Sequence, residues 1–304
     1  MNNPVLIVGS VAFDTIITPF STGKHILGGS ASYACLACSY FTVPQMVSVV
    51  GNDFDPAYLQ RFKKRGIDLE GLQIDQTGKS FSWTGEYNEG FRSRKTTDTQ
   101  VNVFESFQPA IPAAYKKSQY VMLGNIAPEL QSHVLDQMEG NPFVLANTID
   151  LWINLKKRPL LDLIKRLSLL VLNEEEVVQL TGVQNVIQAG RTLLDMGPEM
   201  AIVTRGEAGA YLFYPEGIFA VPAYQVVELR DPTGAGDSFA GSFIGFLASV
   251  ERTDLDSLKK ALFYATATAS LTVEAFSCDR LETVGREAIE SRVEELLSIT
   301  QLEG

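Results

Sequence analysis

The chain contains 304 residues, of which 45% are hydrophobic, and carries a net charge of −11 at pH 7. This length supports one large hydrophobic core, and the composition excludes an intrinsically disordered protein. The negative charge excludes general electrostatic attraction to nucleic acid or to an anionic membrane, so we expect neither as a partner, and an anionic ligand must be held by local geometry.

The first part of the sequence alternates short apolar runs with amphipathic stretches. Residues 4–9 and 47–51 predict buried strands, and residues 30–41 and 55–65 predict helices. This β-α-β-α order indicates an α/β protein with a parallel sheet and crossover helices.

A different pattern follows between residues 78 and 103. Apolar and polar residues alternate there, and Asn88, Glu89 and Gly90 form a turn signal. The alternation predicts antiparallel strands with one solvated face, which project from the main body as a small sheet. We expect a lid formed by about residues 12–30 and 78–104.

The β-α rhythm then resumes, and no repeat or linker divides the chain, so we expect a single domain over residues 1–304. The predicted strands cover residues 120–124, 143–147, 169–172, 201–204 and 210–214, and the predicted helices cover residues 173–182, 235–250 and 258–273, with an acidic helix at the end.

The cellular compartment follows from the termini and the cysteines. No basic stretch precedes a long apolar one at the N-terminus, and no apolar run is long enough to span a bilayer. Cys35 and Cys38 form a C-x-x-C pattern inside an apolar run, which favours buried thiols on a helix over redox or metal chemistry. With three cysteines and two histidines, we expect a cytoplasmic protein without a zinc site.

The clearest functional signal is the sequence DPTGAGD at residues 231–237, between a predicted strand at residues 224–229 and a predicted helix from Ala235. Unpaired amides and the dipole at a helix N-terminus can bind a phosphoryl group, and glycines allow it to approach the backbone. Asp237 beside such a site could accept the proton of an attacking hydroxyl. The residues alone leave open an ordinary helix start, with Thr233 as the N-cap and Asp237 in the first turn.

This segment resembles the D-T-x-G-A-G-D signature of the ribokinase-like (PfkB) carbohydrate kinase family, with Pro232 where threonine is usual. The resemblance covers essentially the whole chain and implies a three-layer α/β/α sandwich with a mainly parallel sheet and a small β-sheet lid. It also implies that Asp237 is the catalytic base and that Asp231 lies near a monovalent-cation site. The implied anion hole is the backbone of Gly234, Ala235 and Gly236.

The same resemblance implies a substrate site. Asp14 matches the aspartate that holds substrate hydroxyls. Gly28 and Gly29, with Ser30 directly after them, match the glycine pair at the substrate site and lid hinge. Tyr33 stands where the family usually has asparagine. By their residue types, Asp14 could instead be a turn or cap residue, and Tyr33 either an aromatic face for the substrate or a core aromatic.

Residues resembling the family's nucleotide site are spread over the second half of the chain. Asn173 and Glu176 match the N-x-x-E motif, in which Glu176 supports Mg²⁺ through water; by sequence alone the motif is a capped helix start. The residues resembling the ATP-binding loop and adenine pocket are Thr204, Gly206, Gly209 and Thr266. The basic lid residues that either help to bind phosphate or form a solvated strand face are Arg92, Arg94 and Lys95.

The leading hypothesis is a kinase that transfers the γ-phosphoryl group of MgATP to a hydroxyl of a small sugar or sugar-like substrate, with potassium as a further candidate cation. A nucleoside acceptor is the main alternative, because Tyr33, Phe81, Trp83 and Phe91 either stack on a base or pack the lid against itself. A non-catalytic sugar or nucleotide sensor is the alternative from another class. An oxidoreductase is disfavoured because no G-x-G-x-x-G follows the first strand. The resemblance also suggests a homodimer through the lid.

Overall fold

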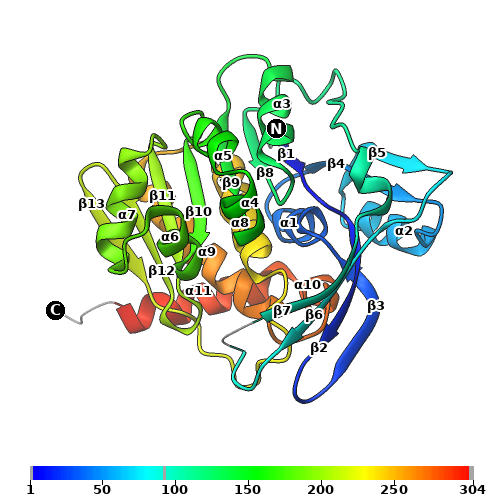
Figure 1. Ribbon diagram of the computed structural model, residues 1–304. Coiled ribbons are helices and arrows are strands. Elements are labelled where there is room, and N and C mark those ends of the chain that lie inside the picture. Colours follow the sequence, from blue (N-terminus) through cyan, green and yellow to red (C-terminus); the bar gives the residue numbers. More distant parts are fainter. Residues whose placement is uncertain (1–2, 92–93, 301–304) are drawn as a thin grey trace.

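A nine-stranded sheet forms the centre of the computed structural model, which describes residues 3–91 and 94–300 (Figure 1). The order is β13-β12-β11-β10-β9-β8-β1-β4-β5; neighbours from β11 to β5 are parallel, and the pairs β11–β12 and β12–β13 are antiparallel. The strands are β1 (Val5–Val8), β4 (Pro44–Gly51), β5 (Asp68–Asp75), β8 (Tyr120–Leu123), β9 (Phe143–Asn147), β10 (Leu169–Asn173), β11 (Met200–Thr204), β12 (Ala210–Tyr214) and β13 (Gly217–Val221).

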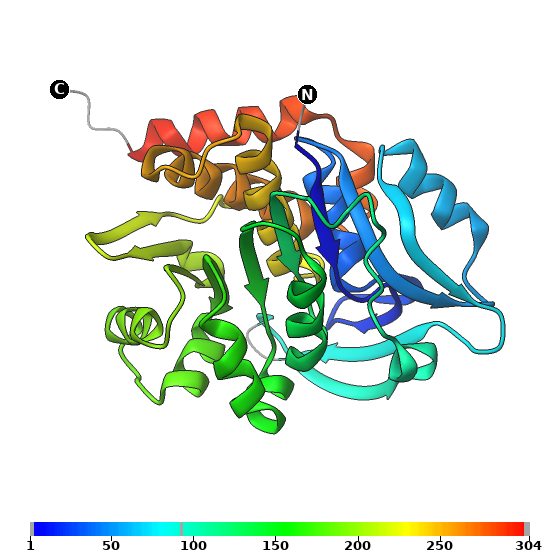
Figure 2. The same cartoon turned by 90° about the horizontal axis from the view of Figure 1, so that it is seen from above.

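Helices cover both faces of this sheet (Figure 2), so the predicted three-layer α/β/α sandwich is confirmed. One face carries α1 (Ser30–Cys38), α2 (Pro56–Lys64), α8 (Ala235–Val250), α9 (Leu255–Thr272), α10 (Asp279–Thr283) and α11 (Arg286–Thr300). The other carries α3 (Pro128–Gln137), α4 (Asp150–Leu155), α5 (Lys157–Ile164), α6 (Glu174–Thr181) and α7 (Val186–Asp195).

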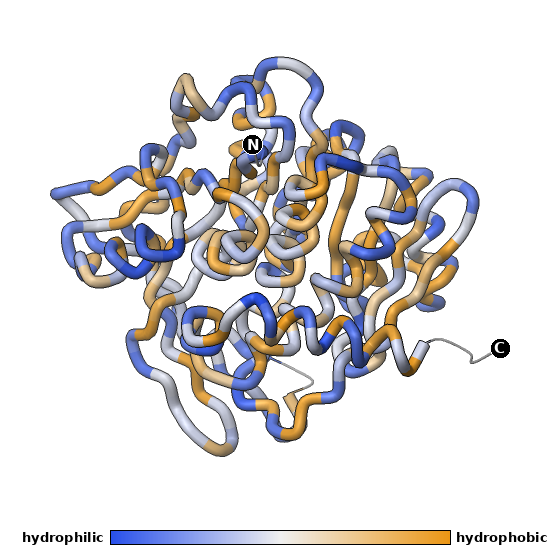
Figure 3. Tube along the Cα trace, turned by 180° about the vertical axis from the view of Figure 1, so that it is seen from behind, coloured by the Kyte–Doolittle hydropathy of each residue, from blue (hydrophilic) through white to orange (hydrophobic). Residues whose placement is uncertain are grey.

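Two hydrophobic clusters hold the layers together, because successive residues of a strand point to opposite faces. In β1, Val5 and Ile7 pack toward α1 and α8, whereas Leu6 and Val8 pack toward α3–α7. Hydrophobic residues concentrate in the strands and the helix faces over them, and the outer loops are mainly hydrophilic (Figure 3). No helix among the described residues is both long and apolar enough to cross a lipid bilayer.

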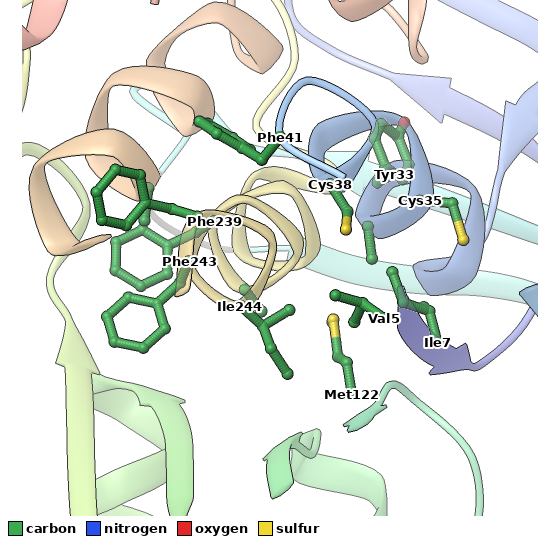
Figure 4. Close-up of a cluster of buried hydrophobic side chains, with 14 of the residues drawn as sticks. Val5, Ile7, Tyr33, Cys35, Cys38, Phe41, Met122, Phe239, Phe243 and Ile244 are labelled. Atoms are coloured by element: carbon green, nitrogen blue, oxygen red, sulfur yellow. The ribbon is translucent and has the colours of Figure 1, made fainter. Parts of the chain in front are cut away.

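Helix α1 lies entirely within the protein. All nine of its residues are buried, and its side chains belong to one hydrophobic cluster with those of α8, β1 and β8 (Figure 4). Cys35 and Cys38 are buried free thiols in this contact, as the sequence predicted. This packing fixes the start of α8 relative to the ends of the strands, because the two helices pack on each other and both contact β1.

The second sheet has four strands in the order β3-β2-β6-β7 and projects from the main body beside the carboxyl ends of the central strands (Figure 1). The strands are β2 (Ala12–Ile17), β3 (Thr22–Gly28), β6 (Phe81–Tyr87) and β7 (Arg94–Gln100). All four lie within residues 12–30 and 78–104, the segments predicted to form a lid. The hairpin of β6 and β7 is antiparallel, as predicted.

The strand predicted at residues 224–229 is wrong. This segment has no regular structure, and the side chain of Val227 is fully exposed. The chain has already left the sheet at the end of β13, so the apolar residues have no neighbouring strand to pair with. A long irregular loop, and not a strand, therefore leads into α8.

Candidate active site

Polar residues gather at the carboxyl ends of the parallel strands. Ser10 follows β1, Asn125 follows β8, and Asn147, Asn173 and Thr204 end β9, β10 and β11. The order of the strands reverses at β1, which has β4 on one side and β8 on the other. In open α/β sheets, ligands bind outside the carboxyl ends at such a switch point.

The N-terminus of α8 faces this edge without a side-chain cap. Gly234 is the N-cap residue, so the alternative in which Thr233 caps the helix is wrong. Gly234 has φ of 76°, and a Cβ atom there would lie 2.4 Å from the ring of Tyr33, so only glycine fits. The amide of Ala235 donates to the carbonyl oxygen of Pro232. The amides of Gly236 and Asp237 belong to the first turn, where a helix supplies no acceptor for them.

Asp237 is half-buried in the first turn of α8 and is held from another element. The Nδ2 atom of Asn147 donates a hydrogen bond to Oδ1 of Asp237 at 2.9 Å. Burial raises the pKa of Asp237 to about 6, while the bond from Asn147 and the positive charge of Arg94 act in the opposite direction. The carboxylate is therefore ionised at neutral pH and can accept a proton.

Asp14 lies on the lid strand β2 and is buried, with 4% of its surface exposed. Burial, and then the negative charges of Asp231 and Asp237, raise its pKa to about 8, while Arg94 opposes the shift. A Cβ atom on Gly28 would lie 2.0 Å from Oδ2 of Asp14, so the carboxyl group occupies the space that this glycine leaves. The structure thus brings Asp14 into the same electrostatic cluster as Asp237.

Ser30 and Tyr33 support the site from within the protein. The hydroxyl of Ser30 accepts hydrogen bonds from the amides of Ser10 and Asn125, both at 3.1 Å, and so joins the ends of β1 and β8. The residue before it, Gly29, is the N-cap of α1. Tyr33 is 1% exposed, and its ring packs against Gly234. This burial favours the core-aromatic interpretation of Tyr33.

Asp231 is 1% exposed at the start of the signature. Its Oδ1 accepts from the amide of Thr233 at 2.9 Å, and its Oδ2 is buried with no hydrogen-bond partner among the described residues. Burial raises its pKa to about 6. A carboxylate oxygen of this kind suits a hard cation. Over residues 3–91 and 94–300, however, no group of three or more His, Cys, Asp or Glu side chains forms a metal site.

The predicted nucleotide residues lie along the neighbouring strands. Asn173 and Glu176 form a capping box at the start of α6, which matches the structural interpretation of this motif. Burial raises the pKa of Glu176 to about 7, and the charge of Asp237 adds to the shift, so Glu176 lies near the catalytic candidate. Thr204 ends β11, Gly206 and Gly209 shape the turn that follows it, and Thr266 is a buried residue of α9.

The lid contributes to the site the positive charge of Arg94 and a hydrogen bond between Tyr87 and Thr233. The hydroxyl groups of Tyr87 on β6 and Thr233 in the signature are 2.9 Å apart and form a hydrogen bond. Arg94 pairs with Tyr87 across the lid sheet, and its charge lowers the pKa values of Asp14, Glu176 and Asp237. Lys95 is exposed on the same strand, and Arg92 lies outside the described residues.

Two residues of the site were missed by the sequence analysis, Asn147 and Tyr87. Asn147 was assigned only to a buried strand, although a polar side chain at the carboxyl end of such a strand is itself a signal for a site. Tyr87 lies in a strand whose alternation marked it as one face of the lid. Its partner, Thr233, is 146 residues away along the chain, and no local pattern identifies that contact.

Known proteins resemble this chain in sequence and in structure. The sequence profile described as pfkB family carbohydrate kinase matches residues 3–283. The cytidine kinase of Thermococcus kodakarensis is 30% identical over 254 residues, which cover 82% of this chain and 88% of that protein.

Two solved structures share the fold. The nucleoside kinase of Methanocaldococcus jannaschii, described as an archaeal member of the ribokinase family, matches with a TM-score of 0.79 and 21% identity, covering 96% of this chain and 98% of that chain. A putative ribokinase II from E. coli, in complex with ATP and Mg²⁺, matches with a TM-score of 0.79 and 19% identity, covering 96% and 99%.

Proposed function

Since the chain belongs to the pfkB family of carbohydrate kinases, we propose that it transfers the γ-phosphoryl group of ATP to a hydroxyl of a small sugar or sugar-like substrate. Membership makes it a phosphotransferase that acts on a hydroxyl group. The observation that carries the proposal is the uncapped N-terminus of α8, with the ionisable carboxyl group of Asp237 in its first turn.

The residues at this helix end can perform the two tasks that the reaction needs. The acceptor hydroxyl loses its proton to Asp237 as its oxygen bonds to the γ-phosphorus, and the bond from that phosphorus to the bridging oxygen of ADP breaks. The amides of Gly236 and Asp237 stabilise the negative charge on the phosphoryl oxygens during transfer, and donors of this kind contribute about 100- to 1000-fold each in rate.

Magnesium and potassium have separate candidate sites. Glu176 is suited to hold Mg²⁺ through water, because only its Oε2 is engaged in the capping box. When bound, Mg²⁺ supplies positive charge to the phosphates. The ATP and Mg²⁺ of the E. coli relative support this part of the proposal. For potassium, the support is the buried, unpartnered Oδ2 of Asp231.

A nucleoside is the second candidate acceptor, and one lid residue favours it. The register of β2 and β6 pairs Asp14 with Trp83, so both side chains lie on the same face of the lid. The indole lies over Gly85, and its Nε1 donates to Thr96 at 3.2 Å. A fixed aromatic ring beside the residue that binds substrate hydroxyls can stack on a base.

The other aromatic candidates pack within the protein. The ring of Phe81 lies 5.7 Å from that of Phe104, and Phe91 contacts both Phe20 and Tyr87. The 30% identity to a cytidine kinase also supports a nucleoside acceptor. Trp83 is therefore the aromatic residue to test for recognition of a base.

The lid also supports the proposed homodimer. Strand β7 is an edge strand that is exposed along its whole length, and such an edge can pair with a second copy. Light scattering of the wild type should give twice the mass of one chain.

A cytoplasmic location is supported by the cysteines. The buried free thiols of Cys35, Cys38 and Cys278 fit a reducing compartment.

The proposal is tested by a panel of acceptors with ATP and Mg²⁺, read by product mass. The panel contains adenosine, cytidine, inosine, ribose, fructose and 2-keto-3-deoxygluconate. We expect one class to gain a phosphoryl group, and no acceptor-dependent ATP consumption with any member would overturn the proposal.

A pair of lid variants then separates the two acceptor classes. For a nucleoside acceptor, Trp83→Ala should raise KM for the nucleoside about tenfold, because stacking contributes roughly 1–3 kcal/mol per base. Phe81→Ala, which removes an aromatic ring that packs on Phe104, is the matched control and should leave KM near the wild-type value.

A further inference from the structure

The geometry points to a second residue that the phosphoryl transfer requires. We propose that Asn147 is a positioning residue that holds the carboxylate of Asp237 in the orientation in which it accepts the acceptor's proton. This inference rests on the proposed function, and it gives Asn147, the last residue of β9, a role in that reaction.

The contact between the two side chains is direct. Asn147 Nδ2 donates to Asp237 Oδ1 at 2.9 Å, although the residues are 90 positions apart in the chain. Because Asn147 engages Oδ1, rotation of the Asp237 carboxylate is restricted, and its Oδ2 is left for the hydroxyl group of the acceptor. The nitrogen of an amide only donates, so the bond favours the ionised form of Asp237, which is the form that acts as a base.

Asn147 is itself held in place by the buried side chain of Gln131 on α3. Nε2 of Gln131 lies 3.2 Å from the carbonyl oxygen of Asn147, 2.9 Å from that of Gly124 and 3.3 Å from that of Leu123. Gln131 is 1% exposed, so this clamp between the ends of β8 and β9 is shielded from water. A general base must be placed to within about 0.5 Å, and this clamp restricts the movement of the residue that holds Asp237.

The amide of Asn147 has no competing task. Its Oδ1 is buried and has no hydrogen-bond partner among the residues that the structure describes. A buried amide normally has a hydrogen-bond partner, and the partner that the structure gives this side chain is Asp237. The contact with Asp237 is therefore the interaction that accounts for an asparagine at this position.

The charged groups around Asp237 come from several elements and remain in place when Asn147 is replaced. They are Arg94 from β7, Asp14 from β2 and Glu176 from α6. A change in the titration of Asp237 in an Asn147 variant would thus report the loss of the asparagine's own hydrogen bond.

The test compares three variants by pH profile. Asn147→Leu keeps the branched shape of the side chain and removes the donor; kcat should fall about 10- to 100-fold, and the acidic limb of kcat/KM should move upward by about one pH unit. KM for ATP should change less than about threefold, because the amides that hold phosphate are intact. Asn147→Asp places a like charge beside Asp237 and should move the limb further upward.

Asn125→Leu is the matched control. It removes an asparagine at the end of the neighbouring strand β8, where Oδ1 accepts from Trp152 Nε1 at 2.8 Å, and should leave the acidic limb at the wild-type pH. Wild-type kcat and an unshifted limb in folded Asn147→Leu would overturn the inference. A loss of thermal stability with the limb unshifted would also overturn it, because that result means a structural role only.

A readout that does not depend on turnover separates this inference from the proposed function. Carbon-13 labelling of aspartate carboxyl groups, assigned with Asp237→Asn, reports the titration of Asp237 by NMR. An upward shift of about one pH unit in Asn147→Leu supports the inference even if no acceptor in the panel is phosphorylated. An unchanged titration overturns it even if the wild type proves to be a kinase.

Discussion

Two helices begin at the same edge of the central sheet, and their first turns are organised differently. Each has an acidic residue at its third helical position, Glu176 in α6 and Asp237 in α8. In α6, Asn173 accepts from the amide of Glu176 at 2.8 Å, and Glu176 accepts from the amide of Asn173 at 2.9 Å. In α8 the N-cap is Gly234, and no side chain caps the helix.

This difference shows how the N-cap residue decides what a helix end can bind. A capping box satisfies the backbone amides of the N-cap residue and of the third helical residue within the chain, whereas a glycine N-cap leaves the amide of the third residue for an external anion. The acidic residue changes its role accordingly. Glu176 turns back to the backbone, while Asp237 is held by Asn147 and can face a substrate.

The largest effect should come from removing the carboxylate at the uncapped helix. Asp237→Asn should lower kcat by about 10³-fold, because general-base catalysis contributes roughly 10²–10⁴. ATP affinity, measured by calorimetry, should stay within about threefold of the wild type, since the amides remain. Turnover near the wild-type rate would contradict the assignment of Asp237 as the base.

The next largest effect should come from replacing the N-cap residue of α8. Gly234→Ala combines a strained φ with a clash against the Tyr33 ring, and should cost about 2–4 kcal/mol of unfolding free energy and about 10-fold or more in kcat. Gly182→Ala, at the end of α6, is the matched control. Gly182 has φ of 75°, but a Cβ atom there would meet no described atom within 4 Å.

The control should therefore lose only about 1 kcal/mol, with kcat unchanged. Thermal unfolding and steady-state kinetics measure both quantities. Equal losses of stability in the two variants would show that the contact between Gly234 and Tyr33 does not shape the helix end.

The pH dependence of stability provides a third test. Burial raises the pKa of Asp237 from 3.8 to about 6, so the folded protein binds more protons than the unfolded chain between these values. The contribution of this group to stability is therefore lost as pH rises through that window and stays lost above it. Asp237→Asn should be more stable than the wild type by about 1–2 kcal/mol at pH 8.

That advantage should shrink as pH falls through this window and disappear below about pH 3, where the carboxyl group is protonated in both states. Denaturant unfolding of both proteins at pH 3 and pH 8 measures it. A variant that is less stable than the wild type at pH 8 would show that burial does not dominate the environment of Asp237.

The smallest effect should come from the capped helix. Asn173→Ala removes one partner of the capping box and should cost about 1 kcal/mol of stability. The expected fall in kcat is less than about tenfold, because the first-turn amides of α8 are unaffected. A loss of activity as large as that of Gly234→Ala would mean that the two helix ends do not differ in function.

Much of the fold could be predicted from the sequence, because local patterns encode it. The strands β1 and β8–β12 are short apolar runs, and α8 begins at the predicted Ala235. The edge strands β5 and β13 and the helices α3, α4, α5 and α7 were not assigned. Strand β5 is partly exposed and has an irregular apolar pattern, so periodicity gives little signal.

The error at residues 224–229 has a physical cause. Alternating apolar residues predict a strand only where a neighbouring strand and a core are available, and here neither is. In the site, the signature located Asp237 and the helix end, but the sequence could not show that Tyr33 is buried against Gly234. The position of Asn147 at the end of a strand was a usable signal, but its contact with Asp237 joins segments that no local pattern connects.

The most direct measurement is a crystal structure with a non-hydrolysable ATP analogue, Mg²⁺ and the acceptor identified by the panel. The account predicts the γ-phosphoryl group within hydrogen-bond distance of the Gly236 and Asp237 amides, and the acceptor hydroxyl about 3 Å from the free oxygen of Asp237. Triphosphate bound away from the start of α8, or Asp237 turned from the acceptor into the protein interior, would contradict it.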